Sequence, residues 1–191
     1  ILIARSPHNQ VATWAVTETI QRDGICIETI TPAPNLSEEV ANLAQQIASD
    51  IANTIKLVGV MAVELFQVGD KLLVNEIALR PHNSGHHTIR ANETSQYEQH
   101  LRAISGLSLG KTASKCFSGM LNLLGEDGYT GPVKYEGLRE ILSIPGVHPF
   151  LYGKKITKPF RKMGHVTILG DSRLEIEEKA EKVRNLIRVI S

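Results

Sequence analysis

The chain has 191 residues, of which 42% are hydrophobic, and its mean hydropathy is −0.08. These values are ordinary for a chain that buries one or two cores, and they exclude a disordered or fibrous protein. The 21 basic and 20 acidic residues leave a net charge of +1, which excludes the general basic field that nucleic-acid binders use. An anion would therefore have to be bound at a specific site.

The ends and the cysteines indicate where such a chain belongs. The longest apolar stretch, residues 57–66, is about half as long as a membrane span and contains Glu64, so we expect no membrane segment. Residues 1–5 have no initiator Met and no secretory signal, which predicts a cytoplasmic fragment cut within a strand. Cys26 and Cys116 lack metal-ligand spacing and are expected to be unpaired core thiols in a reducing compartment.

The first 110 residues predict an α/β lobe with an antiparallel sheet and packed helices. We expect strands over residues 1–5, 24–30, 57–66 and 71–79, and helices over 35–51 and 95–105. Asn35 and Glu38 fit a capping box at the start of the first helix. Gly69 and Asp70 predict a turn that joins the last two strands into a hairpin of mostly buried strands.

The pattern changes around residues 109–112, where we place a domain boundary between 1–110 and 111–191. The second part predicts a smaller α/β domain, so the fold class is α/β (α+β). We expect strands over residues 120–124, 147–152 and 165–169, and helices over 135–142 and 172–190. Ser172 and Glu175 fit a capping box for the last helix.

Two acids interrupt the apolar strands of the predicted hairpin. A two-residue turn would place Glu64 opposite Asn75, whereas a three-residue loop or a bulge places it opposite Glu76, the register we favour. Carboxylates facing each other at about 5 Å repel unless a cation lies between them. Mg²⁺ is suited to such a site and takes further ligands from nucleotide phosphates. The alternative, a solvent face of an amphipathic hairpin, fits poorly because apolar residues flank both acids.

A polar loop follows the hairpin directly, close enough to share a pocket with the acids. Arg80 can hold a carboxylate, bicarbonate or phosphoryl group through two bonds. Asn83 adds a neutral donor, and His82 adds a group that donates or accepts near pH 7. The alternatives are a structural polar loop and a zinc site made by His82, His86 and His87; Pro81 and Gly85 disfavour the helix that this zinc site needs.

A second concentration of charge lies near the end of the chain. Five cations fall within nine residues, namely Lys154, Lys155, Lys158, Arg161 and Lys162. Such a pair of basic segments is suited to a phosphate monoester or a sugar phosphate. A solvated basic turn is the alternative.

Four strings together resemble one family of enzymes. They are residues 59–66 (GVMAVELF), 75–86 (NEIALRPHNSGH), 161–165 (RKMGH) and 21–26 (QRDGIC). They resemble the 5-(carboxyamino)imidazole ribonucleotide synthetases of the ATP-grasp superfamily, also called ATPase subunits of phosphoribosylaminoimidazole carboxylase. The resemblance covers essentially the whole chain. It implies that residues 1–110 form the carboxyl-terminal lobe of an ATP-grasp domain and residues 111–191 a small carboxyl-terminal domain.

The family's reaction implies a role for each candidate residue. Such an enzyme consumes ATP and bicarbonate to N-carboxylate aminoimidazole ribonucleotide in purine biosynthesis, through carboxyphosphate. The implied sites are Mg²⁺ on Glu64 and Glu76, ATP beside Gln21, Asn75 and Glu76, bicarbonate or carboxyphosphate on Arg80, His82 and Asn83, and the ribonucleotide phosphate on Lys154 and Arg161. The family also implies a homodimer and a separate mutase that takes the product.

Three departures separate the chain from the family pattern. Gln21 stands where the family often has a nucleotide-contacting His, and Lys158-Pro159-Phe160 replaces a common Arg-Pro-Gly, which leaves Arg161 the better phosphate ligand. The family's amino-terminal domain and glycine-rich phosphate loop are absent from these residues, so we expect this chain by itself to be inactive. Two rival hypotheses are another ATP-grasp ligase, such as a formate-dependent glycinamide ribonucleotide transformylase or a biotin carboxylase, and a non-catalytic docking or dimerising module.

Overall fold

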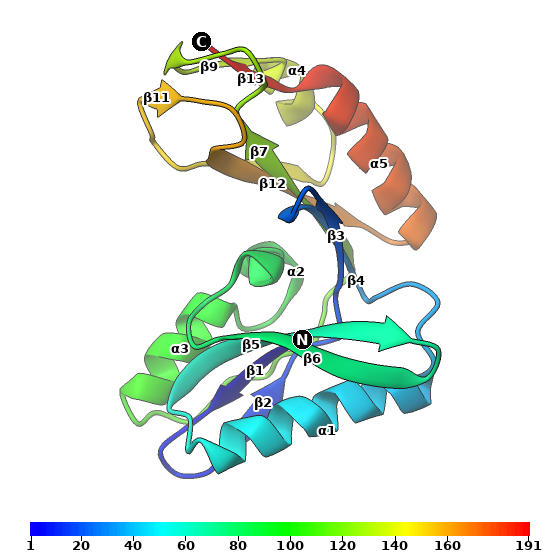
Figure 1. The fold of residues 1–191 in the computed structure, drawn as a ribbon, viewed down its shortest axis with the longest axis vertical. Helices are drawn as coiled ribbons and strands as arrows, with labels where there is room; N and C mark the ends of the chain where they lie inside the picture. The colour runs from blue at the N-terminus through cyan, green and yellow to red at the C-terminus, as the bar shows by residue number, and fades with distance from the viewer. The chain divides into compact units, whose positions relative to one another are not determined.

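The computed structural model describes residues 1–191, which divide into two units (Figure 1). Unit 1 contains residues 1–18 and 31–115, and unit 2 contains residues 19–30 and 116–191. The sequence division at 110/111 thus differs from the structure in one main respect, because residues 19–30 join the second unit. The reason is strand pairing: β4 (Ile25–Thr31) lies beside β7 (Phe117–Leu124) in one sheet. Pairing over such a sequence distance leaves no local signal.

Unit 1 is built on a four-stranded antiparallel sheet of order β2-β1-β5-β6. The strands are β1 (Leu2–Arg5), β2 (Val11–Thr13), β5 (Gly59–Val68) and β6 (Lys71–Ala78). Helix α1 (Glu38–Thr54) packs through Ala48 and Ala52 against Ile3, Met61 and Val63 on one face of the sheet. The other face buries a second cluster, which contains Leu2, Ala4, Trp14, Val60, Ala62 and Ala78.

Short helices follow the hairpin in unit 1. They are η1 (Asn83–Gly85), α2 (Thr88–Ala91) and α3 (Gln96–Ile104). Helix α3 contacts β1 and β5, and it begins as predicted, with the Ser95 hydroxyl accepting from the Glu98 amide at 3.1 Å. The predicted cap of α1 is wrong. Ser37 caps that helix, because its hydroxyl accepts from the Val40 amide at 3.3 Å while Asn35 adopts a left-handed turn conformation with φ 56°.

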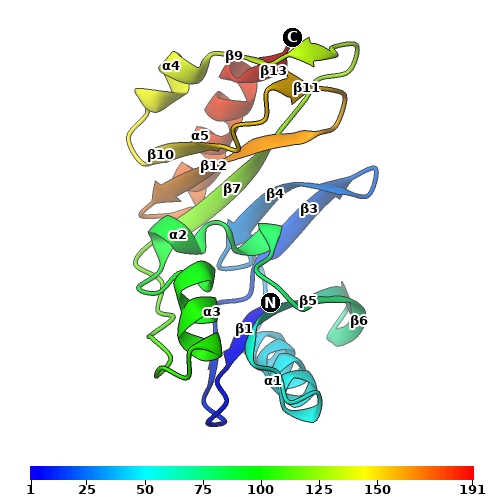
Figure 2. The same cartoon turned by 90° about the vertical axis from the view of Figure 1, so that its left-hand side faces the viewer.

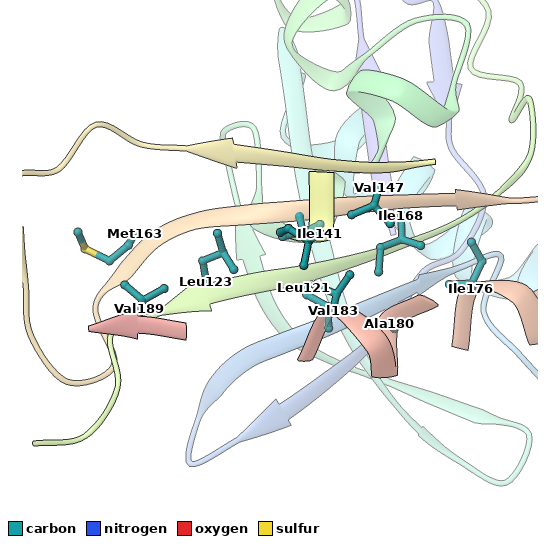
Figure 3. Packing of buried hydrophobic residues seen from close by; sticks show 11 residues of the cluster. Leu121, Leu123, Ile141, Val147, Met163, Ile168, Ile176, Ala180, Val183 and Val189 are labelled. Atoms are coloured by element: carbon teal, nitrogen blue, oxygen red, sulfur yellow. The ribbon is translucent and has the colours of Figure 1, made fainter. Parts of the chain in front are cut away.

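Unit 2 contains a five-stranded sheet of order β10-β12-β7-β4-β3 (Figure 2). Its further strands are β3 (Glu18–Arg22), β10 (Val147–Leu151) and β12 (Lys162–Gly170). Helix α5 (Arg173–Leu186) packs on β7 and β12, and α4 (Leu138–Leu142) packs on β10 and α5. Figure 3 shows the core that these elements enclose, in which Ile141, Met163, Ile168 and Val183 are completely buried.

Two short two-stranded sheets complete unit 2. One of them shows that two predicted helices are shorter than expected. β8 (Gly131–Pro132) pairs with β11 (Ile156–Thr157), and β9 (Lys134–Glu136) pairs with β13 (Arg188–Ile190). The helix predicted over 135–142 therefore begins only at Leu138, and the last helix ends at Leu186. Ile187 and Ile190 fit the helical spacing, but the β-branched end of the chain pairs with β9 instead, and tertiary pairing outweighs local periodicity.

Two smaller expectations concern the cysteines and the membrane. Neither Cys26 nor Cys116 forms a disulfide, and both are only half-buried, so the prediction of core thiols is wrong. No helix of the structure has the length and apolar character needed to cross a membrane.

Candidate functional site in the β5–β6 hairpin

The hairpin brings the two predicted metal-binding acids face to face. Glu64 on β5 is the direct partner of Glu76 on β6, so the register we favoured is confirmed. The register shifts after Glu64, where Asn75 is an extra residue on β6. This bulge turns Asn75 toward the acids, and its Nδ2 donates to Glu64 Oε2 at 3.3 Å. Three polar side chains thus gather at one point of an otherwise apolar hairpin.

The loop after β6 returns a fourth side chain to this point. His82 Nε2 lies 3.6 Å from Glu64 Oε1, and the two side chains are 13% and 21% exposed. The Ser84 amide donates to His82 Nδ1 at 3.4 Å, and the Ser84 hydroxyl lies 2.9 Å from the same atom. Because Nδ1 accepts these bonds, Nε2 carries the proton that faces the carboxylate.

The remaining residues of the loop sit at its exposed edge. Arg80 is exposed, and its Nη1 donates only to the neighbouring carbonyl of Pro81 at 3.2 Å, which leaves most of its donors available to a ligand. Asn83 is half-buried at the start of η1. The sequence therefore identified a real cluster in Glu64, Asn75, Glu76 and His82, whereas Arg80 and Asn83 border it.

The donor set of the cluster fits a hard cation. Two facing carboxylates offer oxygen ligands, and Glu76 is open to solvent, so water or phosphate oxygens could complete the shell that Mg²⁺ prefers. No group of three or more His, Cys, Asp or Glu side chains that could hold a metal occurs in the structure. The three histidines of the proposed zinc site do not converge. His87 is fully buried and bonds Ser84 O through Nδ1, while His86 stacks on Tyr97.

An exposed apolar strip lies beside the acids and was missed by the sequence analysis. Phe66 and Leu73 are direct cross-strand partners, 59% and 55% exposed. Phe66 follows Glu64 by two residues, so both side chains project from the same face of the sheet. The prediction of mostly buried strands is therefore wrong for the outer half of the hairpin, while β5 from Gly59 to Val63 is buried. A large apolar residue two positions from a candidate ligand was the available signal.

The predicted phosphate-binding cations lie in unit 2 and share one turn. Lys154 Nζ donates to the carbonyl of Lys162 at 2.6 Å and lies 5.6 Å from the centre of the Tyr152 ring. Arg161 Nη1 donates to the carbonyl of Ile156 at 2.7 Å. Each cation keeps further donors beyond these bonds. Both side chains are thus anchored by main-chain carbonyls within the same turn.

A buried histidine contacts the residues at the start of this turn. His165 is 2% exposed, stacks on Phe150 at 5.3 Å between ring centres, and has Nδ1 3.0 Å from the Tyr152 hydroxyl. Burial lowers the pKa of His165 to about 4, so the ring is neutral at physiological pH. Gln21 is the third residue expected near the nucleotide, and it is exposed on β3. It belongs to unit 2, whereas Asn75 and Glu76 belong to unit 1.

Comparison with known proteins identifies the protein family to which the chain belongs. Residues 1–97 match the model of the ATP-grasp domain, and residues 118–179 match that of the phosphoribosylaminoimidazole carboxylase C-terminal domain. The chain belongs to the ATP-grasp family. The α/β fold class with an antiparallel sheet, as predicted, agrees with both matches.

Within that family the similarities concern one kind of enzyme. The chain is 45% identical over 183 residues to N5-carboxyaminoimidazole ribonucleotide synthase of Mycobacterium tuberculosis, covering 94% of this chain and 42% of the relative. It is 40% identical to the synthase of Synechococcus elongatus, covering 100% of this chain and 48% of the relative. The chain thus spans about half the length of the curated relatives it matches.

Solved structures agree with this similarity. The N5-carboxyaminoimidazole ribonucleotide synthetase of Thermotoga maritima superposes with a TM-score of 0.93 at 41% identity, over 100% of this chain and 51% of that one. The synthase of Aspergillus clavatus, solved with ADP and 5-aminoimidazole ribonucleotide, gives 0.87 at 32% identity, over 96% of this chain and 49% of that one. The family resemblance seen in the sequence is therefore confirmed.

Proposed function

We propose that this chain is the carboxyl-terminal part of an enzyme that uses ATP and bicarbonate to carboxylate 5-aminoimidazole ribonucleotide on its amine, in purine biosynthesis. The observation that carries the proposal is the facing pair Glu64 and Glu76, with Asn75 and His82 gathered beside it. The pair is suited to Mg²⁺ bound to nucleotide phosphates. The relatives named as such synthases and the neighbour solved with ADP and the ribonucleotide support the same activity.

The hairpin would bind the nucleotide. Glu64 and Glu76 would hold Mg²⁺, which when bound supplies positive charge to neutralise the phosphates. Asn75 would donate its amide to the nucleotide from the same edge. Phe66 and Leu73 form an exposed apolar strip on that face, which is suited to cover a purine ring. Gln21 of unit 2 is a candidate donor to the nucleotide.

The loop would bind the second substrate. In phosphoryl transfer the protein contributes mainly positioning and charge neutralisation. Arg80 would hold bicarbonate through two parallel bonds while a bicarbonate oxygen attacks the terminal phosphorus and ADP leaves. His82 and Asn83 would orient the resulting carboxyphosphate. Attack by the substrate amine on its carbonyl carbon then releases phosphate and gives the carbamate, and water has to be excluded because the intermediate is labile.

Unit 2 would bind the phosphate of the ribonucleotide. Lys154 and Arg161 are held in one turn by main-chain carbonyls and keep donors for a phosphate. We also propose a homodimer in the cytoplasm, and a mutase that consumes the product, which together with this enzyme would complete the carboxylase (lyase) reaction that gives the family its second name.

ATP hydrolysis by the full-length enzyme tests this function, where this chain is joined to the amino-terminal part that its relatives carry. We expect hydrolysis to require both bicarbonate and 5-aminoimidazole ribonucleotide, and Arg80→Ala to lower kcat/KM for bicarbonate by about 100-fold, because one charge-neutralising donor contributes about that much. Coupled release of ADP measures the rate. The chain of 191 residues alone should show no turnover.

The same assay separates the rival hypotheses. Hydrolysis that ignores the ribonucleotide would point to another ATP-grasp ligase. A non-catalytic module would show no hydrolysis and would bind Mg²⁺-nucleotide equally well in wild type, Glu64→Gln and Glu76→Gln. We expect both of these substitutions to weaken Mg²⁺-nucleotide binding, measured by calorimetry.

A further inference from the structure

The main chain of the loop is held by one buried side chain that the proposed chemistry does not use. Gln96, in the first turn of α3, is completely buried. Its Oε1 accepts a hydrogen bond from the His82 amide at 2.8 Å, and its Nε2 donates to the His82 carbonyl at 2.8 Å. A single planar amide therefore bonds both main-chain groups of His82, as a neighbouring strand would.

The rest of the loop is seated on the same residue. The main-chain N–H of Gln96 donates to the Thr88 hydroxyl at 2.9 Å, and that hydroxyl donates to the Gly85 carbonyl at 2.6 Å. A Cβ atom at Gly85 would lie 2.5 Å from Gln96 Oε1 and 2.4 Å from Leu2 Cδ1. The close approach requires glycine at this position. Gln96 Nε2 also lies 3.3 Å from His86 Nδ1. Residues 82–88 are thus held to Gln96 by polar contacts at His82, His86 and Thr88, and by the close packing of Gly85 against its side chain.

We infer that Gln96 is a positioning residue for bicarbonate use. By fixing both main-chain groups of His82, it sets where the imidazole lies, 3.6 Å from Glu64. Arg80 and Asn83 flank His82 in the chain by two residues and one residue, so their main chain is set by the same anchor. The inference rests on the proposed function for the identity of the ligand, while the anchor itself rests on the contacts alone.

Loss of the Gln96 side-chain amide should affect bicarbonate and nucleotide binding differently. Without it the His82 amide loses its bond to Oε1, and the His82 carbonyl loses one donor while it keeps the Gly85 amide at 3.0 Å. The loop can then leave the position that faces the carboxylate pair. The pair itself is fixed by the β5–β6 ladder, whereas the hydrogen bonds of Gln96 go to residues 82–88. Nucleotide binding should therefore survive while bicarbonate binding and its coupling to hydrolysis suffer.

The same helix offers a matched control. Gln99 is also completely buried, and it makes the same pair of bonds to a different residue: Nε2 donates to the Gly110 carbonyl and Oε1 accepts from the Gly110 amide, both at 2.8 Å. Gln99→Leu removes two equivalent hydrogen bonds from α3 without touching the loop that carries Arg80. A general loss of helix packing would appear in both variants.

Steady-state kinetics of the full-length enzyme test the inference. We expect Gln96→Leu to raise KM for bicarbonate about 10-fold or more and to keep KM for ATP within about threefold, since one lost bond is worth roughly a factor of ten. Gln96→Glu keeps the size and the acceptor for the His82 amide but loses the donor, and should fall between wild type and Gln96→Leu. Gln99→Leu should leave KM for bicarbonate within about twofold.

Hydrogen exchange in this chain supplies a readout that needs no activity. Gln96→Leu should accelerate exchange of the amides over residues 82–88 by about 10-fold, and Gln99→Leu should do so only around Gly110. Unchanged exchange at 82–88 in Gln96→Leu, or equal KM changes in the Gln96 and Gln99 variants, would overturn the inference. A wild-type enzyme with no bicarbonate-dependent hydrolysis would refute the proposed function instead, while the exchange result would still decide whether Gln96 holds the loop.

Discussion

Phe160 illustrates how a single residue can carry backbone strain beside a candidate site. It stands where the family pattern has the glycine of Arg-Pro-Gly, and it adopts φ +62°. This left-handed region costs a residue with a Cβ atom about 1–2 kcal/mol. The Phe160 side chain is 56% exposed, so burial recovers little of that cost. The turn that holds Lys154 and Arg161 therefore keeps a glycine-like conformation without the glycine.

Replacing this residue should stabilise unit 2. We expect Phe160→Gly to raise the free energy of unfolding by about 0.5–1 kcal/mol, since the relief of strain exceeds the extra chain entropy of glycine in the unfolded state. Urea denaturation followed by circular dichroism would measure it. Gly153→Ala is the matched control in the same turn: φ is +69° and a Cβ atom would meet nothing within 4 Å, so it should destabilise by a similar amount.

At the scale of elements, the β5–β6 hairpin has two halves with different tasks. In its inner half, β5 from Gly59 to Val63 is buried between α1 and the cluster around Trp14, which fixes the register that sets Glu64 against Glu76. Its outer half exposes Phe66 and Leu73. Large apolar side chains gathered on one exposed face commonly mark a binding site. We therefore expect the outer half to contribute to ligand binding rather than to stability.

This division predicts separate effects on binding and on folding. We expect Phe66→Ser and Leu73→Ser to change the free energy of unfolding of this chain by less than about 0.5 kcal/mol, as at exposed positions generally. Each should weaken ATP binding to the full-length enzyme by about 10-fold, because a covering apolar side chain contributes on the order of 1–2 kcal/mol. Val74→Ser, 49% exposed and paired with Leu65 on the opposite face of the hairpin, should leave both unchanged. Titration calorimetry measures binding and urea denaturation measures stability. Equal binding losses in all three variants would refute a role of the apolar strip in ATP binding.

At the scale of the whole molecule, each unit buries one neutral histidine. Burial lowers the pKa of His87 in unit 1 to about 4, as it does for His165 in unit 2. An unfolded histidine has a pKa near 6.5, so the unfolded state binds the extra protons between pH 6.5 and 4. Stability therefore falls as pH decreases through this window, by at most about 3 kcal/mol for each histidine.

The single tryptophan makes this pH dependence measurable in one unit. Trp14 is 1% exposed in unit 1, so its fluorescence follows the unit that contains His87. We expect urea midpoints measured by Trp14 fluorescence to fall between pH 7 and pH 5. His87→Leu should lower stability at pH 7, because Ser84 O loses its donor, and should flatten the fall. A fall in His87→Leu as steep as in wild type would contradict the assignment, and His165→Phe should leave the Trp14 signal's pH dependence unchanged.

The sequence by itself determined the family and most of the local structure. Two mostly apolar runs joined by a turn at Gly69 and Asp70 predict the hairpin, and two acids in apolar strands predict a cation, because a lone buried carboxylate is costly. Serine and glutamate spacing correctly marked the start of α5 at Ser172, whose hydroxyl accepts from the Glu175 amide. These features depend on contacts between residues near in sequence, which a pattern records.

Tertiary structure decided what joins distant segments. Only pairing with β7 assigns residues 19–30 to unit 2, and only pairing with β9 turns residues 188–190 into a strand rather than the end of a helix. The anchor of His82 on Gln96, fourteen residues away, has no signal in spacing or composition. Each depends on which surfaces meet in the folded chain, and that choice is made by the packing of both partners, not by the local preferences of either.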